Sequence, residues 1–373
     1  MGWSRISRRV PAERARARRT ALLAQLPELG VDGLIVSHLP NVRYLTGFTG
    51  TAGVLLALSD EMVFVSDFRY RTQAGEELDD SVRVEIVASD VWERVSQLLA
   101  ARAGLNRVGF EAHVLSAAES NRLAERLTRS RVVAVTGVVE GLRVAKEPDE
   151  VAAIRRAATL ASDALAATLS TIRPGLRERD VAATLEGELR RRGSEWHPFP
   201  TIVASGPRSA LPHARTSDRV IERGEWLLLD FGAQVDGYCA DLTRTVVVGA
   251  RADDRQRTVY TLVRDAQRRA LECTTAGMTG READTLARAL IEARGFGEAF
   301  GHSLGHGLGL EVHEAPRLSR TNEQPLPLHA VVTVVPGAYF PGWGGVRLED
   351  DLYLGPAGPE LLSDGDTELR ELL

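Results

Sequence analysis

Two aspartates within a strongly apolar segment are the first residues of this sequence that could do chemistry. Asp230 and Asp241 flank the turn signal Asp236-Gly237 in WLLLDFGAQVDGYCADLTRTVVVG. A hairpin of this length would bring the two carboxylates to one end of a sheet. An ionised carboxylate inside an apolar strand is costly unless it is paired or binds a metal. The segment therefore predicts either a metal site or an aspartate that ends its strand and pairs with an arginine.

Three histidines gather in the segment FGHSLGHGLGLEVHE. His302 and His306 are four residues apart, which suits one helix face, but the glycines around them favour a loop that runs into a strand. His313 closes the segment. Because three of the eight histidines in the chain lie so close together, a functional site is favoured over unrelated structural histidines.

Two further segments contribute candidates. His213, in TIVASGPRSALPHARTSD, lies beside a proline and on its own fits an exposed loop histidine. In GVRLEDDLYL, the period of two along a strand places Arg347, Glu349 and Asp351 on one face. Asp350 then points to the other face. This pattern fits metal ligands, but it also fits an arginine–acid ladder on a solvent-exposed face.

The combined donor set indicates which metals to expect. Carboxylate oxygens with one imidazole suit Mn, Co, Fe or Zn better than a metal that prefers thiolates. Carboxylates that bridge two ions allow a pair that generates a hydroxide and polarises a carbonyl. The sequence has only two cysteines and no H-E-x-x-H pattern, which excludes a Cys-rich zinc site and a zincin helix.

Length, composition and charge limit the kinds of protein that this chain can be. The 373 residues suggest two or three domains, and 44% hydrophobic with 26% charged residues is typical of a globular chain. A net charge of -5 argues against a nucleic-acid partner. We expect no membrane span, because no stretch approaches roughly 18 uncharged apolar residues. The basic N-terminal stretch has no apolar run behind it, so we expect no signal peptide and a cytoplasmic location.

The order of helix and strand signals predicts two domains, 1–140 and 141–373. The first alternates short Val-, Leu- and Ile-rich strands with amphipathic helices, and ends in a strand followed by a charged joint. The second opens with a helix pair, and another helix pair interrupts the strands and turns that carry the candidate residues. These four helices are expected at about 148–171, 177–192, 252–275 and 281–294.

Four motifs in this order carry a resemblance to a known family. They are TIVASGPRSALPH, LLLDFGAQVDGYCADLTRTV, GHSLGHGLGLEVHE and GGVRLEDD. Through them, residues 140–370 resemble the M24-type metallopeptidase superfamily, and most closely its Xaa-Pro dipeptidases (prolidases) and aminopeptidase P. NVRYLTGFTG resembles the smaller creatinase-type domain of these enzymes. The resemblance implies an α+β protein, in which a creatinase-type α/β domain precedes a pita-bread catalytic domain with a curved, mostly antiparallel sheet.

The resemblance also implies a dinuclear metal site. Asp230 matches the aspartate that binds one ion, and His306 matches the single histidine ligand of the second ion. Asp241 and Glu349 match the two carboxylates that bridge both ions. The expected cofactors are two divalent ions, which would be Mn, Co or Zn.

Other matched residues would act on the substrate. His213, His302 and His313 match histidines that handle the substrate and the developing oxyanion. Arg347 matches a residue that orients the carboxylate ligands. Arg43, in NVRYLTGF, is a candidate clamp for a substrate carboxylate, because a planar bidentate donor suits that group, although a surface or interface arginine fits equally well.

One position departs from the family pattern. Where relatives have T-V-E-P-G, this chain reads TVVPG, so Val335 replaces the glutamate that binds the second ion and that is a candidate proton carrier. Valine has no donor atom. We therefore expect a second metal position that is weakened or empty, so that only one ion is bound, and depressed activity. The substitution fits a natural change in which water or another residue completes the metal shell, and it also fits an engineered or single-base change in an otherwise intact enzyme. The other motifs are intact, which favours a recent or deliberate change over long decay.

The leading hypothesis is a homodimeric metallopeptidase that hydrolyses the Xaa-Pro bond of dipeptides or short peptides. The first alternative is a catalytically dead member of the fold that binds a peptide or protein. The second is a metal-free hydrolase of creatinase type, or a peptidase with a different end-specificity. Four retained ligand positions argue against a metal-free hydrolase.

Overall fold

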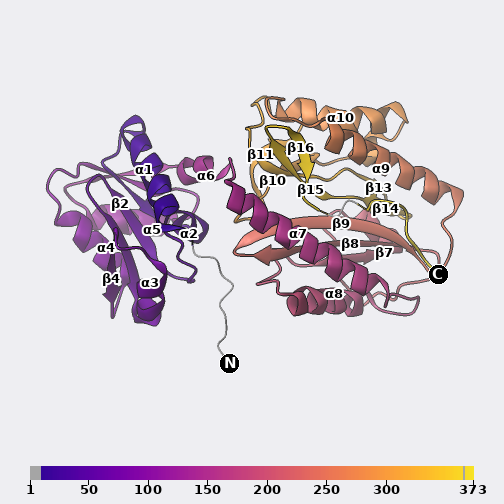
Figure 1. Ribbon diagram of the computed structural model, residues 1–373, viewed down its shortest axis with the longest axis horizontal. Helices are drawn as coiled ribbons and strands as arrows, with labels where there is room; N and C mark the ends of the chain where they lie inside the picture. Colours follow the sequence, from indigo (N-terminus) through magenta and orange to yellow (C-terminus); the bar gives the residue numbers. More distant parts are fainter. Residues whose placement is uncertain (1–9, 364–365) are drawn as a thin grey trace. The chain divides into compact units, whose positions relative to one another are not determined.

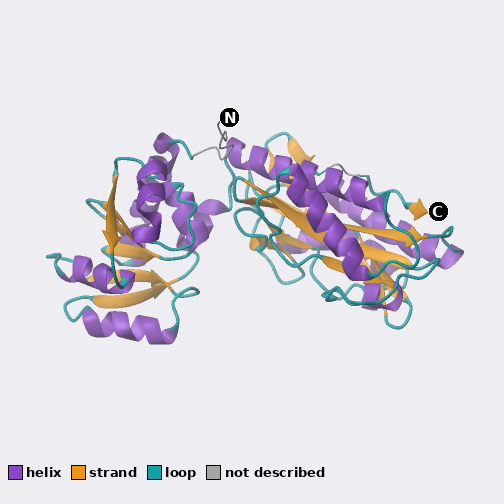
Figure 2. Cartoon of the chain, turned by 90° about the horizontal axis from the view of Figure 1, so that it is seen from below, coloured by secondary structure: helices purple, strands orange, loops and turns teal. Residues whose placement is uncertain are grey.

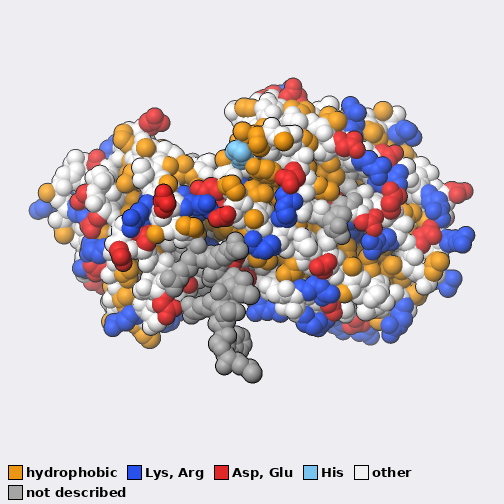
Figure 3. All heavy atoms as spheres, viewed as in Figure 1, with side chains coloured by type: hydrophobic (Ala, Val, Ile, Leu, Met, Phe, Trp, Pro, Cys, Tyr) orange, Lys and Arg blue, Asp and Glu red, His pale blue; other side chains and the backbone are white. Residues whose placement is uncertain are grey.

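The computed structural model describes residues 10–363 and 366–373 of the chain. The chain divides into two compact units, Met1–Arg143 and Val144–Leu373 (Figure 1). Of the basic N-terminal stretch discussed above, residues 1–9 lie outside the described residues. Among the described residues, no helix is long and apolar enough to cross a membrane. On the face drawn in Figure 3, basic and acidic side chains are interspersed over both units.

The first unit is built on a mixed six-stranded sheet in the order β4-β3-β2-β1-β5-β6. Strand β2 runs antiparallel to β1 and β3, and the other neighbours are parallel. Parallel neighbours need crossover connections, which explains the alternating helix and strand signals. The strands are β1 (Gly33–Val36), β2 (Val54–Leu58), β3 (Met62–Asp67), β4 (Val82–Val87), β5 (Arg107–Glu111) and β6 (Arg131–Val135). The helices are α1 (Ala12–Leu29), α2 (Leu39–Thr46), η1 (Phe68–Tyr70), α3 (Arg71–Glu77), α4 (Val91–Ala100), α5 (Ala117–Arg126) and α6 (Val138–Arg143).

The second unit contains three sheets, in the orders β17-β9-β8-β7, β11-β10-β12-β15-β16 and β13-β14. All their pairings are antiparallel except that of β17 with β9, within the described ranges. The strands are β7 (Ile202–Ser205), β8 (Trp226–Val235), β9 (Tyr238–Val248), β10 (Gly305–Gly307), β11 (Glu314–Leu318), β12 (Val331–Val334), β13 (Gly337–Phe340), β14 (Gly344–Arg347), β15 (Asp350–Gly355), β16 (Gly358–Leu361) and β17 (Glu371–Leu372). The helices are α7 (Pro148–Leu169), α8 (Glu178–Arg192), η2 (Gly206–Ala210), α9 (Asp254–Cys273), α10 (Gly280–Ala293) and η3 (Gly297–Ala299).

Two helix pairs cover the sheets of the second unit. Helices α7 and α8 pack on β8 and β9, and α9 and α10 cover the sheet that contains β12 and β15 (Figures 1 and 2). All four helices begin and end within two residues of the bounds expected from the sequence. Local signals fix these ends, because α9 and α10 each begin with a capping box and α8 ends at Gly193, whose φ is 105°.

The β8–β9 hairpin has the turn that the sequence predicts. Asp236 and Gly237 both have positive φ, at 50° and 78°, as a two-residue hairpin loop requires. The turn sets a register in which Asp230 faces Thr243 and Gly232 faces Asp241. Because directly opposed residues and every second residue share one face of a sheet, the two aspartates lie on the same face.

Two connecting segments are more ordered than the sequence indicated. The Pro/Gly-rich stretch after Val335 forms the β13–β14 hairpin. Gly342 and Gly344 turn this hairpin with φ values of 80° and 150°. The charged joint near residue 140 contains helix α6. Elements as short as these show little periodicity in the sequence.

Candidate metal centre and substrate cavity

Two acidic side chains and one histidine side chain, from distant parts of the sequence, meet in the second unit. One ligand atom each from Asp241, His306 and Glu349 lie within 4.8 Å of one another. All three residues are buried. They belong to β9, β10 and the residue just before β15. This group has the chemistry of a divalent-cation site with two carboxylates and one imidazole.

Backbone pairing puts Glu349 beside β9. Its amide donates to the Thr243 carbonyl oxygen at 3.1 Å, and the Thr243 hydroxyl donates to Glu349 Oε2 at 2.8 Å. Thr243 lies two residues beyond Asp241, on the same face of β9. The pairing of Glu349 with β9 therefore brings its carboxylate next to that of Asp241.

The glycines around His306 allow β10 to pack closely between its neighbours. A Cβ on Gly305 would overlap the carbonyl of Thr333, and a Cβ on Gly307 would overlap the carbonyl of Ala315. Thr333 lies in β12 and Ala315 in β11. The glycine-rich motif is thus explained by close backbone approach on both sides of the histidine.

The tautomer of His306 suits a metal ligand. Its Nδ1 lies 3.1 Å from the Gly307 carbonyl oxygen, and a carbonyl can only accept, so Nδ1 carries the proton. Burial lowers the pKa of His306 to about 4, which makes the ring neutral at pH 7. The Nε2 lone pair is then available on the side of Asp241, whose Oδ2 is 3.7 Å away.

The carboxylates in and beside this cluster fit a bound cation. Burial, followed by the charges of neighbouring acids, raises the pKa of Glu349 to about 8 and the pKa of Asp241 well above its usual value. Burial also raises the pKa of Asp351. Oδ1 of Asp241 and Oδ1 of Asp351 are buried without a hydrogen-bond partner in the described structure. Unpartnered, mutually repelling carboxylate oxygens fit a divalent ion, which would satisfy both conditions.

Asp230 lies outside the close triad and pairs with Arg347, whose Nη2 donates to Asp230 Oδ2. Arg347 also donates to the Tyr339 hydroxyl at 3.1 Å, to the Pro212 carbonyl at 2.9 Å and to the Thr243 hydroxyl at 3.3 Å. Asp230 therefore does form the arginine pair considered from the sequence, but it lies in the middle of β8 and does not end it.

The alternative considered from the sequence, an arginine–acid ladder on a solvent-exposed face, is wrong. Arg347, Glu349 and Asp351 are all buried. Asp350 faces the opposite side, where it accepts hydrogen bonds from Arg244 at 2.7 Å and from Gln267 at 2.9 Å. Side chains therefore alternate between the two faces of this strand, as the sequence predicted, but both faces are inside the protein.

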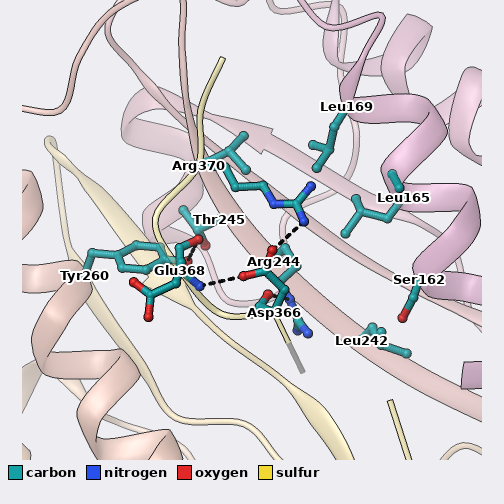
Figure 4. Close-up of a pocket in the computed structure, with 12 residues that line it drawn as sticks. Ser162, Leu165, Leu169, Leu242, Arg244, Thr245, Tyr260, Asp366, Glu368 and Arg370 are labelled. Atoms are coloured by element: carbon teal, nitrogen blue, oxygen red, sulfur yellow. Dashed lines mark hydrogen bonds and ion pairs between the residues drawn. The ribbon is translucent and has the colours of Figure 1, made fainter. Parts of the chain in front are cut away.

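A cavity of about 770 Å³ opens over the cluster. This volume is typical of small-molecule sites. Apolar side chains, including those of Phe199, Pro200 and Ile202, contribute to its wall. The polar lining residues are Asp230, Asp241, His213, His302, His306, His313, Arg215, Arg317, Arg347 and Glu349. A second cavity, between α7 and the C-terminal segment, has only about 50 Å³ and is crossed by the Arg370–Asp366 ion pair (Figure 4), so it is too small for a peptide.

The three non-ligand histidines differ in their surroundings. His302 uses both ring nitrogens, with Nδ1 donating to the Ser303 carbonyl at 2.8 Å and Nε2 accepting from the Tyr339 hydroxyl at 2.9 Å. His213 and His313 line the cavity and are exposed. The His313 ring packs edge-on against His306, with centroids 4.4 Å apart. His213 and His313 are therefore the imidazoles most accessible to a substrate.

Comparison with known proteins decides the family. Residues 152–356 match metallopeptidase family M24, and residues 18–145 match the creatinase/prolidase N-terminal domain. The chain belongs to metallopeptidase family M24. It is therefore a metallopeptidase, and the predicted family and α+β fold class are confirmed.

Several M24 proteins are similar to nearly the whole chain. An uncharacterized peptidase of Bacillus subtilis, YqhT, is 40% identical over 92% of this chain and 96% of its own length. A Xaa-Pro dipeptidase of Pyrococcus horikoshii is 36% identical over 91% and 94%. The solved structure of a Xaa-Pro dipeptidase from Bacillus anthracis superposes with a TM-score of 0.92 at 39% identity, covering 96% of this chain and 99% of that one.

Val335 lies in the cavity of this M24 chain. It directly follows β12, is 8% exposed, and its amide donates to the Leu304 carbonyl at 2.7 Å. The backbone at this position is thus tied to the segment that leads into His306. The valine presents an apolar side chain to the cavity.

Sequence reasoning missed three features of the M24 site. Tyr339 links His302, 37 residues away in sequence, to Arg347 on the other strand of its own hairpin, and no local pattern indicates the contact with His302. Arg317 is exposed, lines the cavity and lies opposite His306 in the β10–β11 register. The segment GHSLG at 301–305 has the G-x-S-x-G spacing of the serine nucleophile in α/β-hydrolases, where the serine lies between a strand and a helix. Here Ser303 is followed by strand β10 and not by a helix, so Ser303 does not lie in such a nucleophile turn.

Arg43 lies in helix α2 of the first unit and is half-buried. It is not among the residues that line the cavity. Its role as a substrate clamp stays a prediction.

Proposed function

We propose that this M24 chain hydrolyses the peptide bond before proline in dipeptides or short peptides. The observation that carries the proposal is the Asp241–His306–Glu349 cluster beneath a cavity of about 770 Å³ with exposed imidazoles on its wall. The names of the relatives in Pyrococcus horikoshii and Bacillus anthracis support the Xaa-Pro preference. The homodimer, the cytoplasmic location and the choice of Mn among divalent ions stay predictions.

Asp230 with Asp241 and Glu349 would hold one ion, and His306 with the same two carboxylates would hold the second ion. When bound, such ions supply an activated water and polarise the scissile carbonyl. We propose that the second position is weak here because Val335 contributes no ligand. Arg347 would position Asp230 through the ion pair between them.

The remaining residues bind and orient the substrate. Burial lowers the pKa of His313, so its ring is neutral at pH 7 and can donate a hydrogen bond to the developing oxyanion. His213 also lines the cavity. Tyr339 holds the ring of His302, which also lines the cavity. The apolar surface of Phe199 and nearby side chains can pack against a proline ring and exclude water.

A panel of substrates tests the proposed specificity. We expect the manganese-loaded chain to release proline from Ala-Pro faster than it cleaves Ala-Ala or Pro-Ala, because the apolar wall favours the ring. A deletion of that wall, Phe199→Ala, should reduce this preference. Equal rates on all three dipeptides would instead support a peptidase with a different end-specificity.

Arg317 is expected to bind the substrate carboxylate. Its exposed guanidinium faces the cavity beside the triad, where it can pair bidentately with a free C-terminus. Arg317→Met should raise KM for Ala-Pro by about 10-fold or more, since a charge-assisted pair contributes roughly 1.5–3 kcal/mol. It should leave KM for the C-terminal amide of the same dipeptide unchanged.

Arg43→Met is the matched control for the Arg317 prediction. If Arg43→Met, and not Arg317→Met, raises KM selectively for the free acid, then Arg43 is the clamp.

Val335 favours one second candidate function, a binding protein that retains the cavity but does not hydrolyse. Such a protein would bind Ala-Pro without releasing proline. Val335→Glu would not restore hydrolysis to it, which separates this candidate from a weakened peptidase.

A further inference from the structure

The chain contains a single lysine, Lys146, among its 46 basic residues. In an otherwise arginine-only protein this lysine is buried, with a side chain 1% exposed. Its Nζ lies 3.2 Å from Oε2 of Glu314, whose side chain is 7% exposed. The Lys146 amide also donates to the His329 carbonyl at 2.8 Å. An ammonium is a compact point charge on a thin stem, whereas a guanidinium needs acceptors for five donors, so this buried position suits lysine.

Glu314 holds together the turn that carries His313. Its Oε1 accepts from the Glu311 amide at 3.0 Å. A Cβ added to Gly309 would lie only 2.7 Å from Oε2 of the same carboxylate, so the carboxylate packs directly on that glycine. The carboxylate of Glu314 therefore contacts two points of the turn formed by residues 309–313, and Lys146 holds the carboxylate.

The same turn connects to the metal ligand. Glu314 pairs with Gly307, the residue after His306, at an irregularity in the β10–β11 register. The His313 ring, adjacent to Glu314 in sequence, packs on the His306 ring at 4.4 Å. A change in the position of Glu314 would thus move His313 relative to the triad.

We propose that Lys146 is a positioning residue for the reaction, which acts through Glu314 to fix the turn that holds His313 over His306. This inference rests on the proposed function for its kinetic consequence. Its structural part, order in the 309–313 turn, does not depend on hydrolysis. The two parts can therefore be tested separately.

The kinetic test is a double-mutant cycle. Lys146→Met removes the charge and the ammonium group but keeps an unbranched apolar stem. In the metal-loaded protein, Lys146→Met should lower kcat for Ala-Pro with KM unchanged, by up to the order of 10²-fold that a misplacement of about 1 Å costs. In a His313→Ala background, the same substitution should have no further effect on kcat, because the group that it positions is absent.

A purely structural role predicts a different result. Lys146→Met would then lower the active fraction by the same factor with and without His313, and such additivity would overturn the proposal. If Lys146→Met does not fold, Glu314→Gln serves instead, because its amide oxygen can still accept from the Glu311 amide, and the same cycle with His313→Ala is expected.

Hydrogen exchange provides the readout that is independent of activity. Lys146→Met should speed amide exchange in residues 309–313 of the metal-loaded protein, while exchange in the β8–β9 hairpin stays the same. The control is Arg19→Met, which breaks a pair of similar burial in the first unit, Arg19 to Asp79 at 2.8 Å. It should lower stability without changing kcat or exchange in 309–313.

Failure of the proposed function and failure of the positioning role give different results. If no variant or parent protein releases proline, the proposed function fails, and faster exchange confined to 309–313 still supports the positioning role. Unchanged exchange in 309–313 after Lys146→Met overturns the positioning role, whatever the activity.

Discussion

Val335→Glu is expected to tighten the second metal position and raise the rate of proline release. Val335 lies in the cavity with His306, and its amide is held by Leu304, so a longer side chain can reach the open space. Loss of even an outer-shell partner costs roughly 10–100-fold in metal affinity, and restoring a direct ligand should gain at least as much. A carboxylate that carries protons adds a rate factor of about 10²–10⁴.

Calorimetric titration with Mn²⁺, followed by the rate of Ala-Pro hydrolysis, measures both effects of Val335→Glu. Val335→Gln is the matched control, since it adds an oxygen donor of the same reach without a charge, and it should recover only a small part of either gain. Equal second-ion affinity in the parent chain and in the Val335→Glu variant would contradict the interpretation of this position.

In the metal-free protein, the contribution of Glu349 to stability is expected to be lost as pH rises. Burial raises the pKa of Glu349 from its ordinary value of 4.5 to about 8 in the folded chain. A raised pKa means that the folded state binds a proton more tightly than the unfolded state does. The stabilising contribution is therefore full below about pH 4.5 and is lost as pH rises through about 8. The slope in this window approaches about 1 kcal/mol per pH unit for one such group.

Saturating Mn²⁺ should reverse this trend. Metal ligands bind in the deprotonated form, so metal binding competes with protons and strengthens as pH rises. Urea unfolding at pH 5 and pH 8, in EDTA and in Mn²⁺, gives the four free energies of unfolding that are needed. Glu349→Gln should flatten the curve in EDTA and remove most of the stabilisation by Mn²⁺. Parallel pH curves with and without Mn²⁺ would show that this cluster does not bind the ion.

Local features of the site could be read from the sequence. Asp236-Gly237 specifies a tight hairpin by its backbone preferences alone, and this turn sets the register that brings Asp230 and Asp241 to one face. The glycines that flank His306 indicated an irregular segment, and they do allow close approach to Thr333 and Ala315. In each case the signal lies within a few residues of the structure that it determines.

Contacts between distant segments could not be read in this way. The pairing of Arg347 with Asp230, and the link from Arg347 through Tyr339 to His302, depend on how β8 and the β13–β14 hairpin pack together. The sequence showed that Lys146 is unique, but its partner Glu314 is 168 residues away. Burial of an ion pair at that separation is a consequence of the tertiary fold, which no local pattern encodes.

The most direct test measures proline release from Ala-Pro as a function of Mn²⁺ concentration, for the parent chain and for Asp241→Ala. Asp241 belongs to the triad and has a buried, unpartnered oxygen, so its loss should abolish ion binding without removing the cavity. We predict slow, saturable release that requires Mn²⁺ in the parent chain and none in Asp241→Ala. Release that persists in EDTA, or that is equal in the two proteins, would contradict a peptidase built on this metal centre.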